Sequence, residues 1–345
     1  MRVPEMRSEV KPSRTMKNIL LALFITAPLP AQGIDSQCLP GNLPMSSSED
    51  PIVAQDACQK AIDLFRYLAP QLGTIVAGGN PTQGIVGTLG GPGHFSFGLR
   101  ANGLSGSIPD IDRVVPGTQG ARVDRYEIDE QLVGFATADL GVGLFKGMAN
   151  SGFGALDALI SASYLPEYSN PSVEVSEPSG GFKFGFGAKL GLLRETGVRP
   201  GIAVSYLVRQ LPTVAITGKS GDDRLSLKDV SIKAKSWRAT AGKSFSFVGF
   251  GGGFGRDTYD SDADITVTVA PREATQGGTG GPIRLTQDLT RTNIFGTVWL
   301  NAKVMRIVGE VGRVSGGTVE TFNQFTGAQP ADARTYYSVG LSFGR

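Results

Sequence analysis

From residue 94 to the end of the chain, large apolar side chains alternate with small or polar ones. Phe95, Phe97 and Leu99 alternate with Ser96 and Gly98, and the stretch 337–344 repeats the pattern with aromatic and aliphatic residues. Successive side chains of a β-strand point to opposite faces. The alternation therefore predicts strands that each have one apolar face and one nearly bare face.

The pattern predicts about ten strands, with ends uncertain by a few residues. They cover residues 94–107, 131–145, 154–165, 181–194, 200–210, 229–243, 246–256, 287–301, 304–315 and 334–344. By subtraction of these bounds, the odd-numbered connections span about 23, 15, 18, 30 and 18 residues, and the even-numbered ones about 8, 5, 2 and 2. Long and short connections alternate along the chain.

This alternation of connection lengths distinguishes two all-β folds. An up-and-down antiparallel barrel places odd connections at one rim and even ones at the other, whereas a sandwich with Greek-key crossings does not sort them. Most of the strands also reach the roughly 9 to 11 residues that a tilted strand needs to cross hydrocarbon. We therefore expect a transmembrane β-barrel over residues 94–345, with both termini on the side of the short turns.

Two strands have ambiguous faces. In 229–243 the apolar row changes phase between Ala234 and Trp237, which predicts a β-bulge near Ser236. In 287–301, Ile294 and Phe295 compete for the lipid side, and we favour the row that contains Ile294.

One helix precedes the strands. Asp50 is a natural N-cap, Pro51 suits the first turn, and apolar residues recur at helical spacing as far as Pro70. The following stretch, 73–93, is glycine-rich, which suits either backbone packed closely against other structure or a flexible linker. Residues 32–93 are thus expected to form a segment that caps the periplasmic mouth of the barrel, enters its lumen as a plug, or lies free in the periplasm.

The N-terminus has the pattern of a secretory signal. Lys17 provides a basic start, Ile19 to Ile25 form a short apolar core, and Ala31 ends a plausible cleavage site. The apolar run is too short to span a bilayer, and a buried N-terminal helix is the alternative. We assign 1–31 to an over-called start, with translation beginning at Met16, followed by the signal peptide.

Export changes the interpretation of the two cysteines, Cys38 and Cys58. An even pair in an oxidising compartment favours a disulfide over a metal site or a nucleophile, with two buried thiols as the alternative. Closing a loop of this length restricts the unfolded chain by about 3 kcal/mol in the entropy model.

Composition narrows the class further. The net charge is +2 and 19% of residues are charged, so nothing indicates nucleic-acid binding. Glycine contributes 48 of 345 residues, without a collagen repeat. The fold must therefore need small side chains at many positions.

The signal sequence, the alternation and a last strand with aromatics at Tyr337 and Phe343 resemble Gram-negative outer-membrane β-barrel proteins. In that family the final residue is often phenylalanine, a mark that the barrel-assembly machinery reads, whereas Gly344 and Arg345 follow Phe343 here. The resemblance implies an outer-membrane location, lipid and lipopolysaccharide around the barrel, and assembly through the C-terminal strand.

If the apolar rows face lipid, ten charged side chains are expected to line the lumen. They are Arg100, Asp139, Asp157, Lys183, Lys189, Arg209, Lys233, Lys235, Arg306 and Glu310. These charges could pair into a structural network or line a small pore. Basic residues outnumber acidic ones in this set, so a pore would favour anions.

Catalytic and metal sites have weaker support. His94 and Ser96 match the spacing of a phospholipase pair but would sit at the periplasmic rim without an orienting group, and Asp139 and Asp157 have no fixed separation. Asp260, Asp262 and Asp264 have calcium-loop spacing without the required glycine and distal glutamate, which favours a solvated loop tip. We expect no catalytic site, cofactor or metal.

The leading functional hypothesis is a narrow channel or transporter for small solutes or apolar molecules. A non-transporting barrel that anchors the envelope is the second hypothesis, and an outer-membrane hydrolase is the third. All three follow from fold-level analogy, because no motif names a substrate.

Overall fold

The structure is a computed structural model that describes residues 33–44, 49–110, 117–165, 167–169, 173–178, 180–273 and 276–344. The predicted signal sequence and the start at Met16 lie outside the described residues. Within the described part of the chain, no helix is long and apolar enough to cross a membrane.

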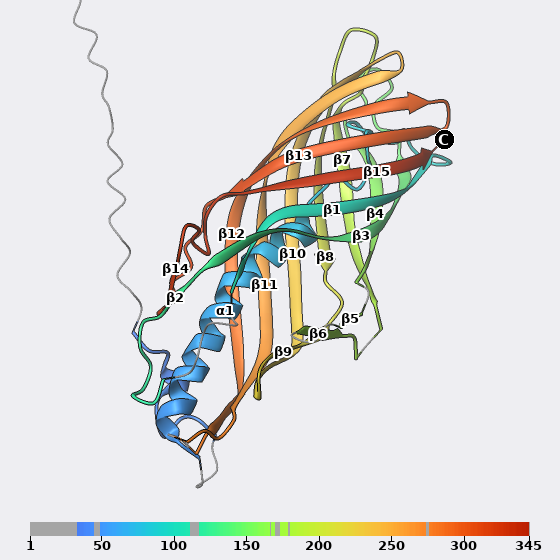
Figure 1. The fold of residues 1–345 in the computed structure, drawn as a ribbon. Helices are drawn as coiled ribbons and strands as arrows, with labels where there is room; N and C mark the ends of the chain where they lie inside the picture. The colour runs from blue at the N-terminus through green and yellow to red at the C-terminus, as the bar shows by residue number, and fades with distance from the viewer. Residues whose placement is uncertain are drawn as a thin grey trace, which may run out of the picture. The chain divides into compact units, whose positions relative to one another are not determined.

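Ten antiparallel strands close into a ring, as the sequence predicts (Figure 1). In ring order they are β1 (Phe95–Pro109), β3 (Ile128–Phe145), β4 (Ala155–Tyr164), β7 (Phe182–Leu193), β8 (Gly201–Gln210), β10 (Asp223–Phe245), β11 (Val248–Val269), β12 (Gly278–Ala302), β13 (Met305–Ser315) and β15 (Arg334–Gly344). The last strand pairs with the first, with Phe97 opposite Phe343 and Leu99 opposite Leu341. Closure leaves no free sheet edge around the ring, which a sheet in hydrocarbon requires.

Short strands add to this ring at the rim of the long connections. They are β2 (Arg125–Tyr126), β5 (Tyr168–Ser169), β6 (Val173–Ser176), β9 (Val214–Ser220) and β14 (Gln324–Phe325). β9 pairs with the outer part of β10, and β6 and β5 follow it, whereas β2 and β14 form a separate parallel pair. They extend the wall on one side, where β4, β7 and β8 end earlier than β10 to β12.

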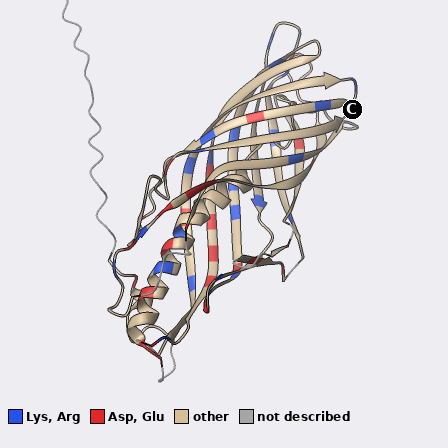
Figure 2. Cartoon of the chain, in the orientation of Figure 1, with Lys and Arg blue, Asp and Glu red and all other residues tan. Residues whose placement is uncertain are grey.

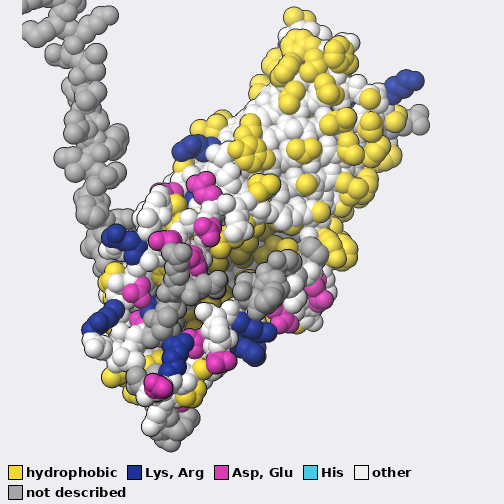
Figure 3. Space-filling view, in the orientation of Figure 1, with side chains coloured by type: hydrophobic (Ala, Val, Ile, Leu, Met, Phe, Trp, Pro, Cys, Tyr) yellow, Lys and Arg dark blue, Asp and Glu magenta, His cyan; other side chains and the backbone are white. Residues whose placement is uncertain are grey.

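The outer face is apolar at the end of the barrel near the C-terminus and polar at the other end. Figure 3 shows hydrophobic side chains gathered over the half nearer the C-terminus and charged ones over the opposite half. Phe186 and Val339 are each 62% exposed and Ile294 is 64% exposed, whereas its neighbour Phe295 is buried. The preference for the Ile294 row is therefore confirmed. Exposed aromatic and aliphatic rows of this extent need a hydrocarbon solvent.

In the three longest strands, β10, β11 and β12, the apolar side chains face outward near the C-terminal end of the barrel and inward beyond it. On β10, Trp237 points outward, whereas Val230, Ile232 and Ala234 point inward and are buried. The pairing of β10 with β11 is continuous through Ser236, and the register shift lies between Lys228 and Ser231 instead. The predicted bulge near Ser236 is wrong, because the change of apolar phase marks the exit from the membrane and not an extra residue.

The same inversion explains why three strands are longer than predicted. β11 continues to Val269 instead of 256, β12 begins at Gly278 instead of 287, and β10 begins at Asp223 instead of 229. Beyond the membrane their outward residues are charged, so the apolar alternation that reveals a lipid-facing strand disappears there.

The helix α1 (Pro51–Ala77) begins as predicted but does not end at Pro70. The side chain of Asp50 accepts a hydrogen bond from the backbone of Ile52, 3.0 Å away, and Pro51 occupies the first turn. A proline inside an isolated helix costs about 3 kcal/mol. Here the helix is buried on nearly all sides by β10, β11 and β12, and this packing carries it past Pro70.

α1 enters the barrel from the rim of the long connections (Figure 1). The backbone of Asp50 donates to Gly277 between β11 and β12, 2.8 Å away, and the other end of the helix lies inside the ring. Residues 80–93 then lead to His94 at the rim of the short turns, where β15 also ends. Of the three arrangements expected for residues 32–93, the described residues have the one in which the segment enters the lumen. The helix does not cap the rim of the short turns, because it enters the barrel from the opposite rim.

The disulfide between Cys38 and Cys58 is confirmed, but it lies at the rim of the long connections. It joins the short 3-10 helix η1 (Ser36–Cys38) to α1 and packs in an apolar cluster with Ile265 and Ile283 of β11 and β12. Since long connections of such barrels face the exterior and short turns face the periplasm, this segment belongs on the external side.

This orientation predicts opposite labelling of two engineered cysteines in intact cells. Pro44→Cys lies at the rim of the long connections, and Val198→Cys lies in the turn between β7 and β8, where Val198 is 90% exposed. A maleimide carried on a large polyethylene glycol should modify Pro44→Cys in intact cells and Val198→Cys only after permeabilisation. The unmodified chain, whose two cysteines form the disulfide, is the control. The reverse pattern would contradict the orientation.

Candidate functional site

The C-terminal end of α1 lies in the middle of the lumen and is held by three arginines from the wall. The last carbonyls of a helix have no partners within it. Arg100 of β1 donates to the carbonyl of Gly78 at 2.5 Å, and Arg209 of β8 donates to the carbonyls of Ala77 and Gly78, both at 3.0 Å. Arg238 of β10 donates to Ala77 at 2.6 Å. We call these three residues the arginine clamp.

Carboxylates of the wall complete the clamp. Asp139 of β3 lies 3.0 Å from Arg100 and 3.8 Å from Arg209. Arg238 lies 3.6 Å from Glu310 of β13, and it lies 3.9 Å from Asp257 of β11. All these side chains are buried. The clamp thus combines cations at the negative end of the helix dipole with ion pairs that offset part of their desolvation.

Below the clamp, residues 79–93 form a segment that we call the plug segment. Lys189 of β7 donates to the hydroxyl of Thr82 at 2.7 Å and to the carbonyl of Ile85. Asp157 of β4 accepts a hydrogen bond from the backbone of Leu89 at 2.9 Å. The wall therefore binds the plug segment largely through its backbone and hydroxyl groups.

Glycines in the wall make room for this segment. A Cβ atom at Gly98 or Gly340 would overlap the side chain of Gln83. Gly79 itself has φ +72° and lies against Arg100, so a side chain there would be both strained and blocked. The strand faces with small side chains, which the sequence predicts, are the faces that contact the plug segment.

Several buried polar atoms around the plug segment have no partner among the described residues. They include both polar atoms of the Gln83 side chain amide, Oδ1 of Asp157 and Nε of Arg209. Buried polar groups are nearly always hydrogen-bonded, to protein or to water. A lumen with several unpaired polar atoms suits water and small polar solutes.

The structure places eight of the ten predicted lumen residues on the inner face of the ring. Arg100, Asp139, Asp157, Lys189, Arg209 and Glu310 are buried inside, and Lys183 and Arg306 are half-buried on the same face. Lys233 and Lys235 instead point outward, and Lys235 pairs with Asp260 at 2.6 Å. Those two assignments are wrong, because the apolar row that includes Val230 and Ile232 faces the lumen there.

Sequence reasoning missed Arg238 and Asp257. Arg238 was left out of the predicted lumen set, although the assumed bulge at Ser236 also turns it inward, and Asp257 lies one residue beyond the expected end of its strand. The signal that could have found Arg238 was Trp237, because an outward tryptophan in a regular strand places the next residue inside.

The other chemical candidates are not brought together as sites. His94 is exposed at the rim, with Nδ1 3.2 Å from the carbonyl of Gly91. The predicted calcium-loop residues lie on the outer face of β11 and not at a loop tip; they are Asp260, Asp262 and Asp264. On that face Arg284 pairs with Asp262 at 2.9 Å and with Asp264 at 3.4 Å. Within the described residues, no group of three or more potential ligands is arranged to hold a metal ion.

The clamp should contribute measurably to stability. Arg209→Ala removes the donors to the carbonyls of Ala77, Gly78 and Gly79 and leaves Asp139 with Arg100 alone. We therefore expect a loss of about 3 kcal/mol in the free energy of unfolding. Arg284→Ala is the matched control, because Arg284 is exposed and its ion pairs are worth about 1 kcal/mol or less. Unfolding in detergent, followed by the shift between folded and unfolded bands on a gel, measures both. Equal losses would contradict the role of the clamp.

No protein-family model and no curated protein matches the chain. Among solved structures, the translocator domain of the autotransporter NalP from Neisseria meningitidis is 12% identical and aligns over 85% of this chain and 98% of that one, with a TM-score of 0.36. Ail, the attachment invasion locus protein of Yersinia pestis, is 8% identical over 74% of this chain and 99% of its own, with a TM-score of 0.26. The P. putida toluene transporter TodX is 10% identical over 92% and 99%, with a TM-score of 0.19.

The fold itself gives the class. Ten antiparallel strands form a closed ring whose outer face is apolar over a band and whose inner face is polar and filled by the N-terminal segment. These features give the chain the fold of the outer-membrane β-barrel proteins.

Proposed function

We propose that the protein is a gated, narrow outer-membrane channel for small polar solutes, in which the plug segment is the gate. The observation that carries this proposal is a difference between the two parts of the chain inside the barrel, α1 and the plug segment. α1, the outer half, is anchored by extensive apolar packing, and the plug segment, the inner half, is held mainly by polar contacts.

The outer half is α1, which packs in a continuous series of apolar clusters. Phe65 and Ile62 contact the inward faces of β10 to β12, and Ile75 packs with Leu104 and Tyr336. Together with the disulfide, these contacts fix the helix. Displacing it would expose a large apolar area, at about 25 cal/mol for each Å².

The plug segment has a different interface with the wall. Its one apolar cluster among the described residues is Val86 with Trp299 and Val308. Its polar contacts include hydrogen bonds donated by Lys189, Arg209, Thr240 and Ser342, and one that the backbone of Leu89 donates to Asp157. Water or a solute can replace such hydrogen bonds at small net cost, since a typical one contributes only about 1 kcal/mol net. Residues 79–93 can therefore move while α1 stays in place.

The charges of the inner face favour anions. Eight basic side chains of the described ring strands face the lumen and are buried or half-buried, namely Arg100, Lys183, Lys189, Arg209, Arg238, Arg291, Arg306 and Arg334. Four acidic side chains face it, namely Asp139, Asp157, Asp257 and Glu310. A pore with a surplus of positive charge concentrates anions.

A second candidate function is a barrel that never opens and serves to anchor or stabilise the envelope. The fixed outer half, with its disulfide and apolar clusters, favours this alternative. The two functions differ in whether the plug segment moves, and a reversible cross-link tests that motion.

The cross-link joins Thr88 in the plug segment to Gly191 on β7. A Cβ atom at Gly191 would lie 3.1 Å from Cγ2 of Thr88, which suits a disulfide between Thr88→Cys and Gly191→Cys. In planar bilayers we expect the oxidised double variant to stay closed and to regain wild-type conductance when a reductant is added. The two single variants under the same oxidation are controls.

Other outcomes decide against the gate. Conductance that is unchanged by the cross-link would show that solutes do not pass where the plug segment lies. A silent wild type, together with a silent variant that carries Arg100→Ala, Arg209→Ala and Arg238→Ala, would favour the non-transporting barrel.

A further inference from the structure

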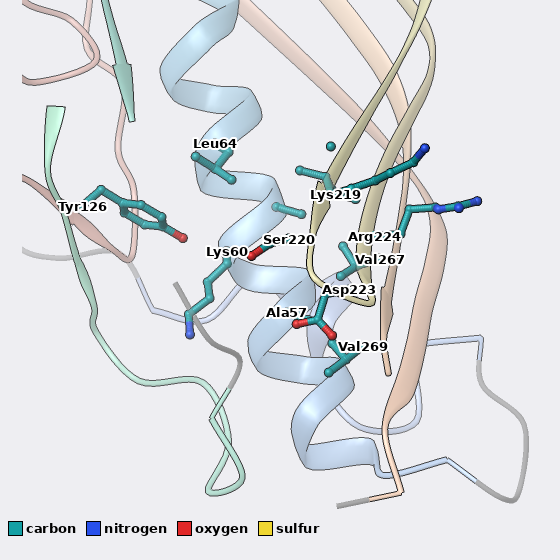
Figure 4. Close-up of a pocket in the computed structure, with 13 residues that line it drawn as sticks. Ala57, Lys60, Leu64, Tyr126, Lys219, Ser220, Asp223, Arg224, Val267 and Val269 are labelled. Carbon is teal, nitrogen blue, oxygen red and sulfur yellow. The ribbon is translucent and has the colours of Figure 1, made fainter. Parts of the chain in front are cut away.

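A groove lies over α1 at the external end of the barrel, separate from the lumen. Its floor is formed by Ala57, Ala61 and Leu64 of α1, and one wall is formed by the hairpin of β9 and β10 (Figure 4). The opposite wall is formed by Tyr126 of β2. The groove lies where β10 and its partner β9 extend outward beyond Gln210, the last residue of β8. Its cavity volume of about 80 Å³ leaves room for a small molecule only.

The lining has an apolar floor with polar and charged side chains at its edges, and one of its polar groups is unpaired. Leu225, Val267 and Val269 add to the apolar residues of the floor. The side chain of Tyr126 is 1% exposed, yet its hydroxyl has no hydrogen-bond partner among the described residues. Figure 4 shows this hydroxyl pointing toward α1. A buried hydroxyl without a partner is destabilising, and an acceptor bound in the groove would recover that loss.

The tyrosine is held in place and cannot easily turn toward water. Its ring stacks on Phe325 of β14, with centroids 5.2 Å apart, and Phe325 stacks in turn on Tyr67 of α1 at 4.2 Å. The hydroxyl is therefore a fixed donor at one end of an apolar groove. Such a group orients a ligand and selects for one that carries an acceptor.

The charges around the groove disfavour an anionic group at this end. Lys60 lies 2.6 Å from both Asp56 and Asp124, so two carboxylates offset its charge. Burial, followed by the charges of Asp63, Asp124 and Asp56, raises the pKa of Tyr126 well above its usual value, so its hydroxyl stays protonated. The head groups of Lys219 and Arg224 point away from α1 (Figure 4). A neutral ligand fits this environment better than an anion.

We propose that this groove binds a small, neutral, largely apolar molecule that carries one hydrogen-bond-accepting oxygen, such as a phenol or an alcohol. Its apolar body lies on Ala57, Ala61 and Leu64, and its oxygen accepts from Tyr126. The site does not depend on conduction through the lumen, so it stands whether or not the barrel opens.

Three probes with the same ring system test the proposal on the full chain in detergent. They are 1-naphthol, naphthalene without the oxygen, and 1-naphthoate with a negative charge. Equilibrium dialysis against matched protein-free micelles removes the contribution of partitioning into detergent. We expect one 1-naphthol bound per chain, with naphthalene bound about three- to tenfold more weakly through loss of one hydrogen bond, and 1-naphthoate more weakly than 1-naphthol.

Two variants and one control complete the test. Tyr126→Phe should bind 1-naphthol and naphthalene equally, and Ser220→Trp, whose side chain would fill the groove, should weaken both. Tyr206→Phe makes the same chemical change on the lipid-facing side, where Tyr206 is 52% exposed, and should behave as wild type. The gel shift between heated and unheated samples shows whether each variant folds.

Four results would overturn the proposal. They are the absence of binding above the micelle background, a preference for 1-naphthoate, an unchanged preference for 1-naphthol in Tyr126→Phe, and wild-type binding by Ser220→Trp. If Tyr126→Phe does not fold, the Ser220→Trp measurement decides alone.

Discussion

A helix that ends inside a barrel presents unpaired carbonyl oxygens to a space with little room for water. In this protein the wall provides the donors, from Arg100, Arg209 and Arg238 on three different strands. Each arginine must itself be neutralised, which Asp139, Asp257 and Glu310 achieve from three further strands. The end of one helix thus determines the charges on six strands of the ring, and the lumen cannot be understood without the segment inside it.

The ring lies in two solvents, and the side chains of its longest strands change accordingly. Near the C-terminus the apolar residues face out toward hydrocarbon and the polar ones face the plug segment. Toward the long connections the apolar residues of β10 to β12 turn inward onto α1, and charged residues cover the outside (Figure 2). The backbone continues regularly through this change. One part of each strand therefore faces hydrocarbon, and the other part packs on α1 as in the core of a water-soluble protein.

Much of this fold could be predicted from the chain alone. The all-β class, ten strands, the closing pair of strands and the disulfide all follow from alternation, connection lengths and export, since each is a local pattern with one physical cause. Most of the inward charges also follow, because a polar residue between lipid-facing neighbours must point inside. Lys233 and Lys235 were misassigned at one place, where a change of solvent has the same pattern in the sequence as a β-bulge, and Arg238 on the same strand was missed.

The location of α1 could not be predicted in the same way. Asp50 and Pro51 show where the helix starts, but its partners are inward residues spread over β10 to β12, far along the chain. The arginine clamp depends on the same long-range placement, because nothing next to Arg100 or Arg209 shows that a helix end lies opposite. Local patterns reveal which side chains are buried, whereas their partners depend on topology.

The path of the chain has one more consequence. The ten strands cross the membrane an even number of times, but the stretch from Pro51 to His94 crosses the same thickness once more through the lumen. The total number of passages is therefore odd, so residues 33 and 344 are on opposite sides of the bilayer. A polypeptide joined ahead of residue 33 would be displayed to the surroundings of the cell, while the strand that completes the cylinder ends inside the envelope.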